Sequence, residues 1–235
     1  MMGNLARSVY ITLCVMIEAL RDQIPPELRS RSGAVFYSGR KAFSLPASLY
    51  VLGINPGGDP KTHKSDTVEA QAEKVLREKP DDWSAYRDDE WKKGLAAGKA
   101  SLQVRILHLF SGLGLNPGHV PSSNVVFLRS CRAQHIAHEF DVLADRCWPF
   151  HSAVLAKLKP RVVVCFGGKA GRYVCGRLNA QTPLEEMKEQ NDRGWRSRVF
   201  VNANDLRVVV LTHPSVADWR AKGTDPTLLV QRALQ

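Results

Sequence analysis

Two short polar segments of this chain carry side chains that could act on a bound ligand. Asn55 lies in the first, Gly-Ile-Asn-Pro-Gly at residues 53–57, and His213 opens the second, His-Pro-Ser at residues 213–215. An amide can orient a water molecule through its carbonyl oxygen, although it cannot act as a general base as a carboxylate does. An imidazole N–H can bond an oxygen on which negative charge develops.

Apolar runs precede both segments and predict the strands that position them. Residues 48–52 precede the first segment and residues 207–211 the second, so each should begin where a buried strand ends. Open α/β sheets place their ligand sites at that end. Further strands are expected at residues 124–130 and 161–166, and residues 198–201 should form a hairpin with the last strand.

Helical patterns alternate with these strands. Residues 68–77, 149–159 and 169–178 each suit a helix, and residues 102–113 carry apolar side chains at helical spacing. An N-terminal amphipathic helix is expected from the spacing of Leu5, Val9, Leu13, Ile17 and Leu20. Unbroken Val-rich strands that alternate with helices predict a three-layer α/β/α sandwich with a central, mainly parallel four-stranded sheet. We interpret residues 1–235 as a single domain.

Composition narrows the choice of partners. The chain has 235 residues, of which 44% are hydrophobic and 24% charged, which is typical of a soluble globular protein. Its formal net charge of +10 favours an anionic partner such as nucleic acid. The apolar run at residues 9–17 is too short to cross a bilayer, and five cysteines without a CxxC pair do not indicate a disulfide framework. We therefore expect a cytoplasmic monomer that binds no membrane.

Together the motifs resemble those of a known family. Residues 53–57 look like the first motif of the uracil-DNA glycosylase superfamily, in its asparagine form, and residues 213–215 look like the second. A stretch within residues 147–167 is similar to the helix-to-strand segment of the iron-sulphur branch. The resemblance covers residues 48–60 and 124–219, in the family's order. It implies a uracil-DNA glycosylase-like fold and hydrolysis of the N-glycosidic bond of a flipped, deaminated base such as uracil during DNA repair.

The resemblance implies roles for particular residues. Asn55 would orient the attacking water and His213 would bond the departing base, so these two are the predicted catalytic residues. Ser215 and the backbone N–H groups of Gly57 and Gly58 would hold DNA phosphates. The residues predicted to bind the substrate or the DNA are Gly53, Ile54, Pro56, Gly57, Gly58, Phe127, Arg129, Ser130, Pro214, Ser215, Trp219 and Arg220.

A flipped base also needs an aromatic platform, and a duplex that has lost a base from its stack can hold a wedge. Phe127, Tyr86 and Trp83 are candidates for the platform, although large aromatic side chains also belong to cores. Trp219 and Arg220 lie just beyond the second motif, where this superfamily inserts its wedge. An exposed Trp219 would favour that role, and a buried one would remove it.

The chain departs from the family pattern at the second strand. Family members that excise uracil carry an asparagine at the end of this strand, where it reads the edge of the pyrimidine. The expected strand places Phe127, Leu128 or Arg129 there, whereas Asn124 lies at its start and suits a turn or a cap. The resemblance therefore does not imply specificity for uracil.

A second departure concerns metal. Cys131 and Cys147 have the spacing of the two later cluster ligands of the iron-sulphur branch, but its earlier CxxC pair is absent, and Cys14 lies inside a helical pattern. Two thiolates do not hold a four-iron cluster, so we expect no metal and no cofactor. Cys131 and Cys147 would then be a packed relic of such a site or a close thiol pair.

The remaining polar residues have ordinary structural interpretations. Asp59 and Asp66 could assist as bases, but Asp59-Pro60 suits a turn and Asp66 suits an N-cap. No metal-ligand pattern with carboxylates is formed by His63, His108, His119, His135, His138 and His151. Two other functions stay open: a nucleic-acid-binding protein of the same fold without excision activity, and a protein that binds a nucleoside or nucleotide in the strand-end pocket.

Overall fold

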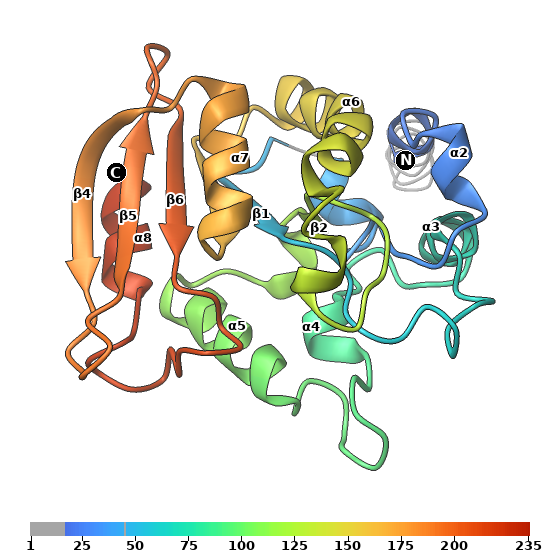
Figure 1. The fold of residues 1–235 in the computed structure, drawn as a ribbon, viewed down its shortest axis with the longest axis horizontal. Helices are drawn as coiled ribbons and strands as arrows, with labels where there is room; N and C mark the ends of the chain where they lie inside the picture. Colours follow the sequence, from blue (N-terminus) through green and yellow to red (C-terminus); the bar gives the residue numbers. More distant parts are fainter. Residues whose placement is uncertain (1–16, 45) are drawn as a thin grey trace, which may run out of the picture.

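The computed structural model of the chain describes residues 17–44 and 46–235, and a six-stranded sheet lies at its centre (Figure 1). The strand order is β2-β1-β3-β6-β5-β4. The strands are β1 (Leu49–Gly53), β2 (Ser122–Asn124), β3 (Val162–Phe166), β4 (Thr182–Lys188), β5 (Arg196–Val201) and β6 (Arg207–Leu211). β2, β1, β3 and β6 are parallel, and β5 and β4 pair antiparallel. The parallel part of the sheet has four strands, and the antiparallel β5 and β4 extend the sheet beyond the four strands that the sequence predicts.

Helices cover both faces of the parallel strands (Figure 1). The α-helices are α2 (Pro26–Arg29), α3 (Val68–Arg77), α4 (Ala85–Asp88), α5 (Ser101–Gly112), α6 (Phe140–Leu158), α7 (Gly168–Leu178) and α8 (Thr227–Ala233), and the 3₁₀ helices are η1 (Arg40–Phe43), η2 (Pro117–His119) and η3 (Ala133–Ile136). Tyr50 and Val163 pack with α6 and α7, whereas Val51 and Val164 pack with α5 and α8. Successive side chains of a strand point to opposite faces, so the layers are those of an α/β/α sandwich.

Several predicted elements occur where the sequence places them. α3 spans the predicted residues, and α5 buries Ile106, Leu109 and Phe110 as their spacing indicates. Ile17 and Leu20 are buried in a helical segment, whereas Leu5, Val9, Leu13 and Cys14 lie outside the described residues. None of the helices in the described part of the chain is long and apolar enough to cross a membrane.

α6 is longer than the sequence predicts. It begins at Phe140 and holds Pro149 in its interior, so the prediction that the helix starts near Pro149 is wrong. Phe140, Leu143, Ala144 and Cys147 are buried and continue the helical pattern before the proline. Packing of this face outweighs the loss of one backbone donor at Pro149. The sequence also predicts no strand at β4, because β4 is a mostly exposed edge strand of polar residues.

Candidate active site at the carboxyl edge of the sheet

The loops that follow β1 and β2 continue the pairing of these two strands. Val125 donates its N–H to the carbonyl of Gly53 (2.9 Å), and Ser130 donates its N–H to the carbonyl of Pro56 (3.0 Å). Residues 53–57 are therefore tied to the loop that follows β2 and do not form an isolated turn. Backbone hydrogen bonds to residues 125–130 hold the first motif in place.

Asn55 is half-buried, and its amide has one fixed side and one free side. Nδ2 donates to the carbonyl of Pro56 (2.9 Å), the carbonyl of Leu128 (3.2 Å) and the hydroxyl of Ser130 (2.8 Å). Only the NH₂ group can donate, so these three acceptors determine which way the amide points. Among the described residues no donor bonds Asn55 Oδ1. The carbonyl oxygen is thus available to a water molecule.

His213 follows β6 and has a defined tautomer. The backbone N–H of Ser215 donates to His213 Nδ1 (3.0 Å), and the Ser215 hydroxyl lies 2.7 Å from the same nitrogen. A nitrogen that accepts from an N–H carries no proton, so the proton of the neutral ring is on Nε2. Burial lowers the pKa of His213 to about 4. At neutral pH the ring is therefore an uncharged donor through Nε2.

Trp219 supports the loop that carries His213. It is 1% exposed, its ring packs against Phe166 with centroids 5.3 Å apart, and its Nε1 donates to the carbonyl of Thr212 (3.1 Å). The Thr212 N–H in turn donates to the hydroxyl of Ser197 (3.0 Å). The prediction that Trp219 is a duplex wedge is therefore wrong, because tertiary packing places the ring inside the core. Arg220 is exposed and paired with Asp218 (2.8 Å).

The sheet brings the two motifs to one edge. β3 lies between β1 and β6, and all three are parallel, so residues that follow β1 and β6 are separated by two strand spacings, or roughly 10 Å. Gly167, which follows β3 with φ 92°, lies between them, and a Cβ there would be 3.4 Å from the His213 side chain.

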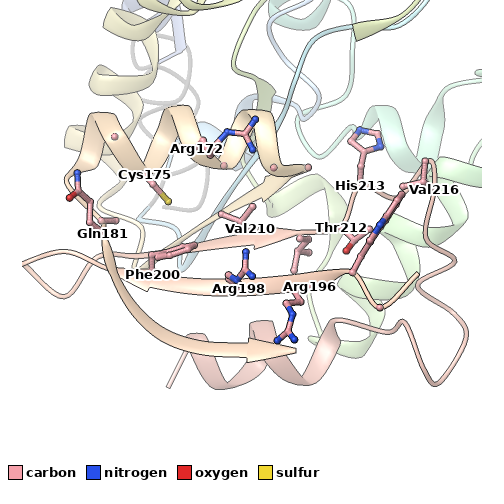
Figure 2. A pocket seen from close by; sticks show the side chains of 18 residues that line it. Arg172, Cys175, Gln181, Arg196, Arg198, Phe200, Val210, Thr212, His213 and Val216 are labelled. Carbon is pink, nitrogen blue, oxygen red and sulfur yellow. The ribbon is translucent and has the colours of Figure 1, made fainter. Parts of the chain in front are cut away.

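Two cavities flank this edge, one on each side. The larger, of about 1070 Å³, lies between α7 and strands β5 and β6, and His213 lines one end of it (Figure 2). The smaller, of about 450 Å³, is lined by Asp59, Arg129 and Ser130 among others. Asn55 lines neither cavity, so its position relative to His213 follows from the strand order.

Asn124 corrects the sequence prediction for the second strand. β2 ends at Asn124, directly beside Gly53 of β1, rather than beginning there. A Cβ on Gly53 would lie 2.1 Å from Asn124 Oδ1, so the asparagine side chain covers the glycine. The apolar residues 125–128 are buried as a loop and not as the predicted strand. An asparagine therefore does stand at the end of the second strand, and the prediction that none is available there is wrong.

An aromatic residue that the sequence does not single out, Tyr37, lies beside Asn124. Burial raises the pKa of the Tyr37 phenol to about 12, and the Asn124 side chain beside it acts in the opposite direction. Its ring packs edge-on against Trp91, which is 36% exposed, with centroids 6.2 Å apart. Tyr37 precedes the first motif and carries no motif of its own. Its backbone places it at this site: its N–H donates to the Ser122 carbonyl (2.9 Å), and its carbonyl accepts from the N–H of Ala85 (2.9 Å).

The predicted aromatic platforms belong to the core. Phe127 is fully buried, with its ring centroid 5.3 Å from that of Phe150, so the prediction that it contacts substrate is wrong. Tyr86 and Trp83 are each 3% exposed, and their burial removes them as platforms as well. In each case the ring fills the interior, as large apolar side chains do when loops cross a sheet.

Predicted phosphate-binding residues lie on both loops. Gly57 is exposed, Gly58 has φ 108°, and Arg129 Nη1 donates to the carbonyl of Gly57 (2.5 Å).

Other predicted binding residues are less accessible. Ile54 is half-buried, and Pro56, Ser130 and Pro214 are buried. Arg105, which the sequence does not single out, donates to the carbonyl of Pro214 (2.5 Å) and so braces the second motif. Ser215 is exposed and its hydroxyl faces the His213 ring, so it orients the imidazole.

The cysteines and acidic residues near the motifs have separate surroundings. Cys131 is an exposed free thiol, whereas Cys147 is buried in α6, which raises its pKa to about 12. Within the described ranges no three His, Cys, Asp or Glu side chains are grouped to hold a metal ion. Asp59 Oδ1 accepts the N–H of Lys61 in a turn. The N-cap of α3 is Thr67 rather than the predicted Asp66, which pairs instead with His63 (2.9 Å).

The other histidines are dispersed. His135 and His138 are exposed, His108 pairs with Asp225 (2.8 Å), and burial lowers the pKa of His119. His151 is fully buried behind β1, where its Nδ1 accepts from the hydroxyl of Tyr50 (2.8 Å). It supports the core rather than the sheet edge.

The structure is an open α/β protein that brings an amide and a neutral imidazole from separate loops to the carboxyl edge of its parallel strands, the edge at which such sheets place ligand sites. Residues 40–234 match the family model described as the Uracil DNA glycosylase superfamily, and the chain belongs to this family. It is thus a DNA glycosylase-like protein. None of the curated proteins compared with the chain matches it.

Proposed function

We propose that this protein hydrolyses the N-glycosidic bond of a flipped, deaminated base in DNA, with uracil as the substrate that its site suits best. One observation carries the proposal: at the same edge of the sheet, Asn55 offers a free carbonyl oxygen and His213 a free N–H, each held from behind by hydrogen bonds. Cleavage separates an oxocarbenium-like sugar from an anionic base. Asn55 would hold the water on the sugar side, and His213 would bond the base oxygen.

The protonation state of His213 suits this role. A pKa of about 4 keeps the ring neutral in the cell, so Nε2–H stabilises the anionic base by a hydrogen bond and not by proton transfer. Loss of one such donor costs a factor of about 10² to 10³ in rate. Asn55 cannot take the proton of the attacking water, so we expect slower hydrolysis than a carboxylate at this position would support.

Asn124 supports uracil as the base. Its amide combines donors and an acceptor, and the exposed edge of uracil presents an N–H beside a carbonyl, which is the complementary pattern. Cytosine presents an amino group and an unprotonated nitrogen along the same edge and requires the opposite arrangement. The side chain is only 6% exposed and lies over Gly53, as expected for a residue on the floor of a base-binding site.

The experiment is a gel assay for abasic sites in oligonucleotides that contain uracil, xanthine or hypoxanthine. Uracil release by the wild type, reduced at least 100-fold by both Asn55→Ala and His213→Ala, is the expected result. The matched controls are Asn204→Ala and His138→Ala, because both residues are exposed and lie outside the motifs, Asn204 in the turn before β6 at the opposite end of that strand from His213. Binding of DNA without base release by the wild type would contradict the proposal and favour a binding protein of the same fold.

A further inference from the structure

A long groove lies beside the candidate active site and is larger than one base requires. Figure 2 shows it between α7 and the strands β5 and β6, with His213 and Val216 at one end and Cys175 and Gln181 at the other. Its volume of about 1070 Å³ lies just above the range of roughly 300–1,000 Å³ for small-ligand pockets. It follows α7, whose 11 residues span roughly 16 Å. The groove therefore has room for several connected groups.

The groove is positively charged. Arg172, Arg196 and Arg198 line it, and no aspartate or glutamate is among its lining residues. Within the described residues Arg172 forms no ion pair or hydrogen bond, and its guanidinium lies near Gly168 at the start of α7. Arg196 and Arg198 share one carboxylate, that of Glu186 on β4, which leaves a net positive charge.

Aromatic and small residues complete the lining. Phe200 lies on the floor, half-buried, and Trp195 is 45% exposed, with the Arg193 guanidinium 4.6 Å from its ring centroid. On the opposite wall, Gly176 carries no side chain, and a Cβ there would meet nothing within 4 Å. Basic side chains beside accessible aromatic rings are the features by which proteins hold single-stranded nucleic acid.

We propose that this groove binds the unpaired continuation of the DNA strand on one side of the target nucleotide. The inference rests on the proposed function for its connection to the site, because His213 belongs to both. Phosphates would contact the three arginines and bases would stack on Phe200 and Trp195. Rings can stack on these side chains only when the bases are unpaired, because bases in a duplex stack on one another. The protein should therefore prefer single-stranded DNA.

The test is fluorescence anisotropy with a labelled 12-nucleotide oligothymidine and with a duplex of the same length, over a series of salt concentrations. Each lost phosphate contact makes the slope of the logarithm of the association constant against log salt less negative by about 0.7. This corresponds to roughly eightfold weaker binding at 50 mM salt, relative to the limit of 1 M salt. We expect this change for Arg172→Gln and for Arg198→Gln. Arg146→Gln is the matched control, since this exposed arginine of α6 loses the same charge outside the groove. Its slope should equal that of the wild type.

A steric variant tests the same surface without changing charge. Gly176→Phe would place a ring in the open space of the groove, so we expect at least tenfold weaker binding of the oligothymidine with an unchanged melting temperature. Equal affinity and equal salt slope for the wild type and all groove variants would overturn the inference, as would an equal loss of duplex binding. The oligothymidine holds no damaged base, so this result is independent of whether the protein excises one.

Discussion

Replacement of Gly53 by alanine should disable the site through Asn124. The new Cβ would lie 2.1 Å from Asn124 Oδ1, whereas ordinary contacts are about 3.5 Å or longer. The amide must therefore move by roughly 1.4 Å, the difference between the two distances. Asn124 is buried, so this shift displaces its amide within the packed site. A displacement of about 1 Å can cost about 10² in rate, and we expect Gly53→Ala to lower kcat/KM for uracil release about 100-fold.

Gly112→Ala is the matched control for this experiment. A Cβ there would lie 2.6 Å from Thr227 Cγ2, so it overpacks the fold outside both motifs, and its excision rate should stay within about twofold of the wild type. Overpacking at Gly53 should also destabilise the fold by about 1–3 kcal/mol, which corresponds to a decrease of about 2–12 °C in Tm. Single-turnover excision is therefore measured well below the lowered Tm. Wild-type kcat/KM in Gly53→Ala would refute this account of how Asn124 is held.

Two further predictions concern His213 and Trp219. Burial depresses the pKa of His213 to about 4, so the ring stays neutral as the pH falls from 8 to 5, and excision rates should show no inflection near pH 6.5 and a decline near pH 4. The unfolded chain, with its higher His213 pKa, binds this proton at a higher pH than the folded protein. The Tm should therefore fall as the pH drops from about 6.5 towards 4, and less steeply in His213→Gln. An inflection of the wild-type rate at about pH 6.5 would contradict the structure. Trp219→Phe removes the hydrogen bond to Thr212 and leaves a gap beside Phe166, so we expect a loss of about 1–3 kcal/mol in thermal unfolding with duplex affinity unchanged. Lost duplex affinity at an unchanged Tm would instead indicate a wedge.

The sequence predicts the strands that carry the two motifs for a simple reason. β1, β3 and β6 are buried between helices, so their side chains are apolar without a break, and such runs are visible in any chain. Asn55 and His213 follow β1 and β6 directly. Because the carboxyl ends of parallel strands meet at one edge, their common location was predictable without coordinates.

The second strand was not predictable in this way. Residues 125–128 are as apolar as a buried strand, but they are buried as a loop, and the paired strand is the polar segment that ends at Asn124. Hydrophobic pattern reports burial and not hydrogen-bond pairing. It therefore placed Asn124 at the wrong end of the strand.

The sequence alone determines a parallel α/β sheet, the family motifs at Asn55 and His213, and a basic surface. It can do so because strand order along the chain and residue chemistry are local properties. Only the tertiary structure decided which groups meet: Asn124 against Gly53, Tyr37 beside Asn124, and Trp219 in the core rather than at the surface. Those contacts join segments far apart in the chain, and their geometry depends on how the loops pack over the sheet edge, which no local pattern records.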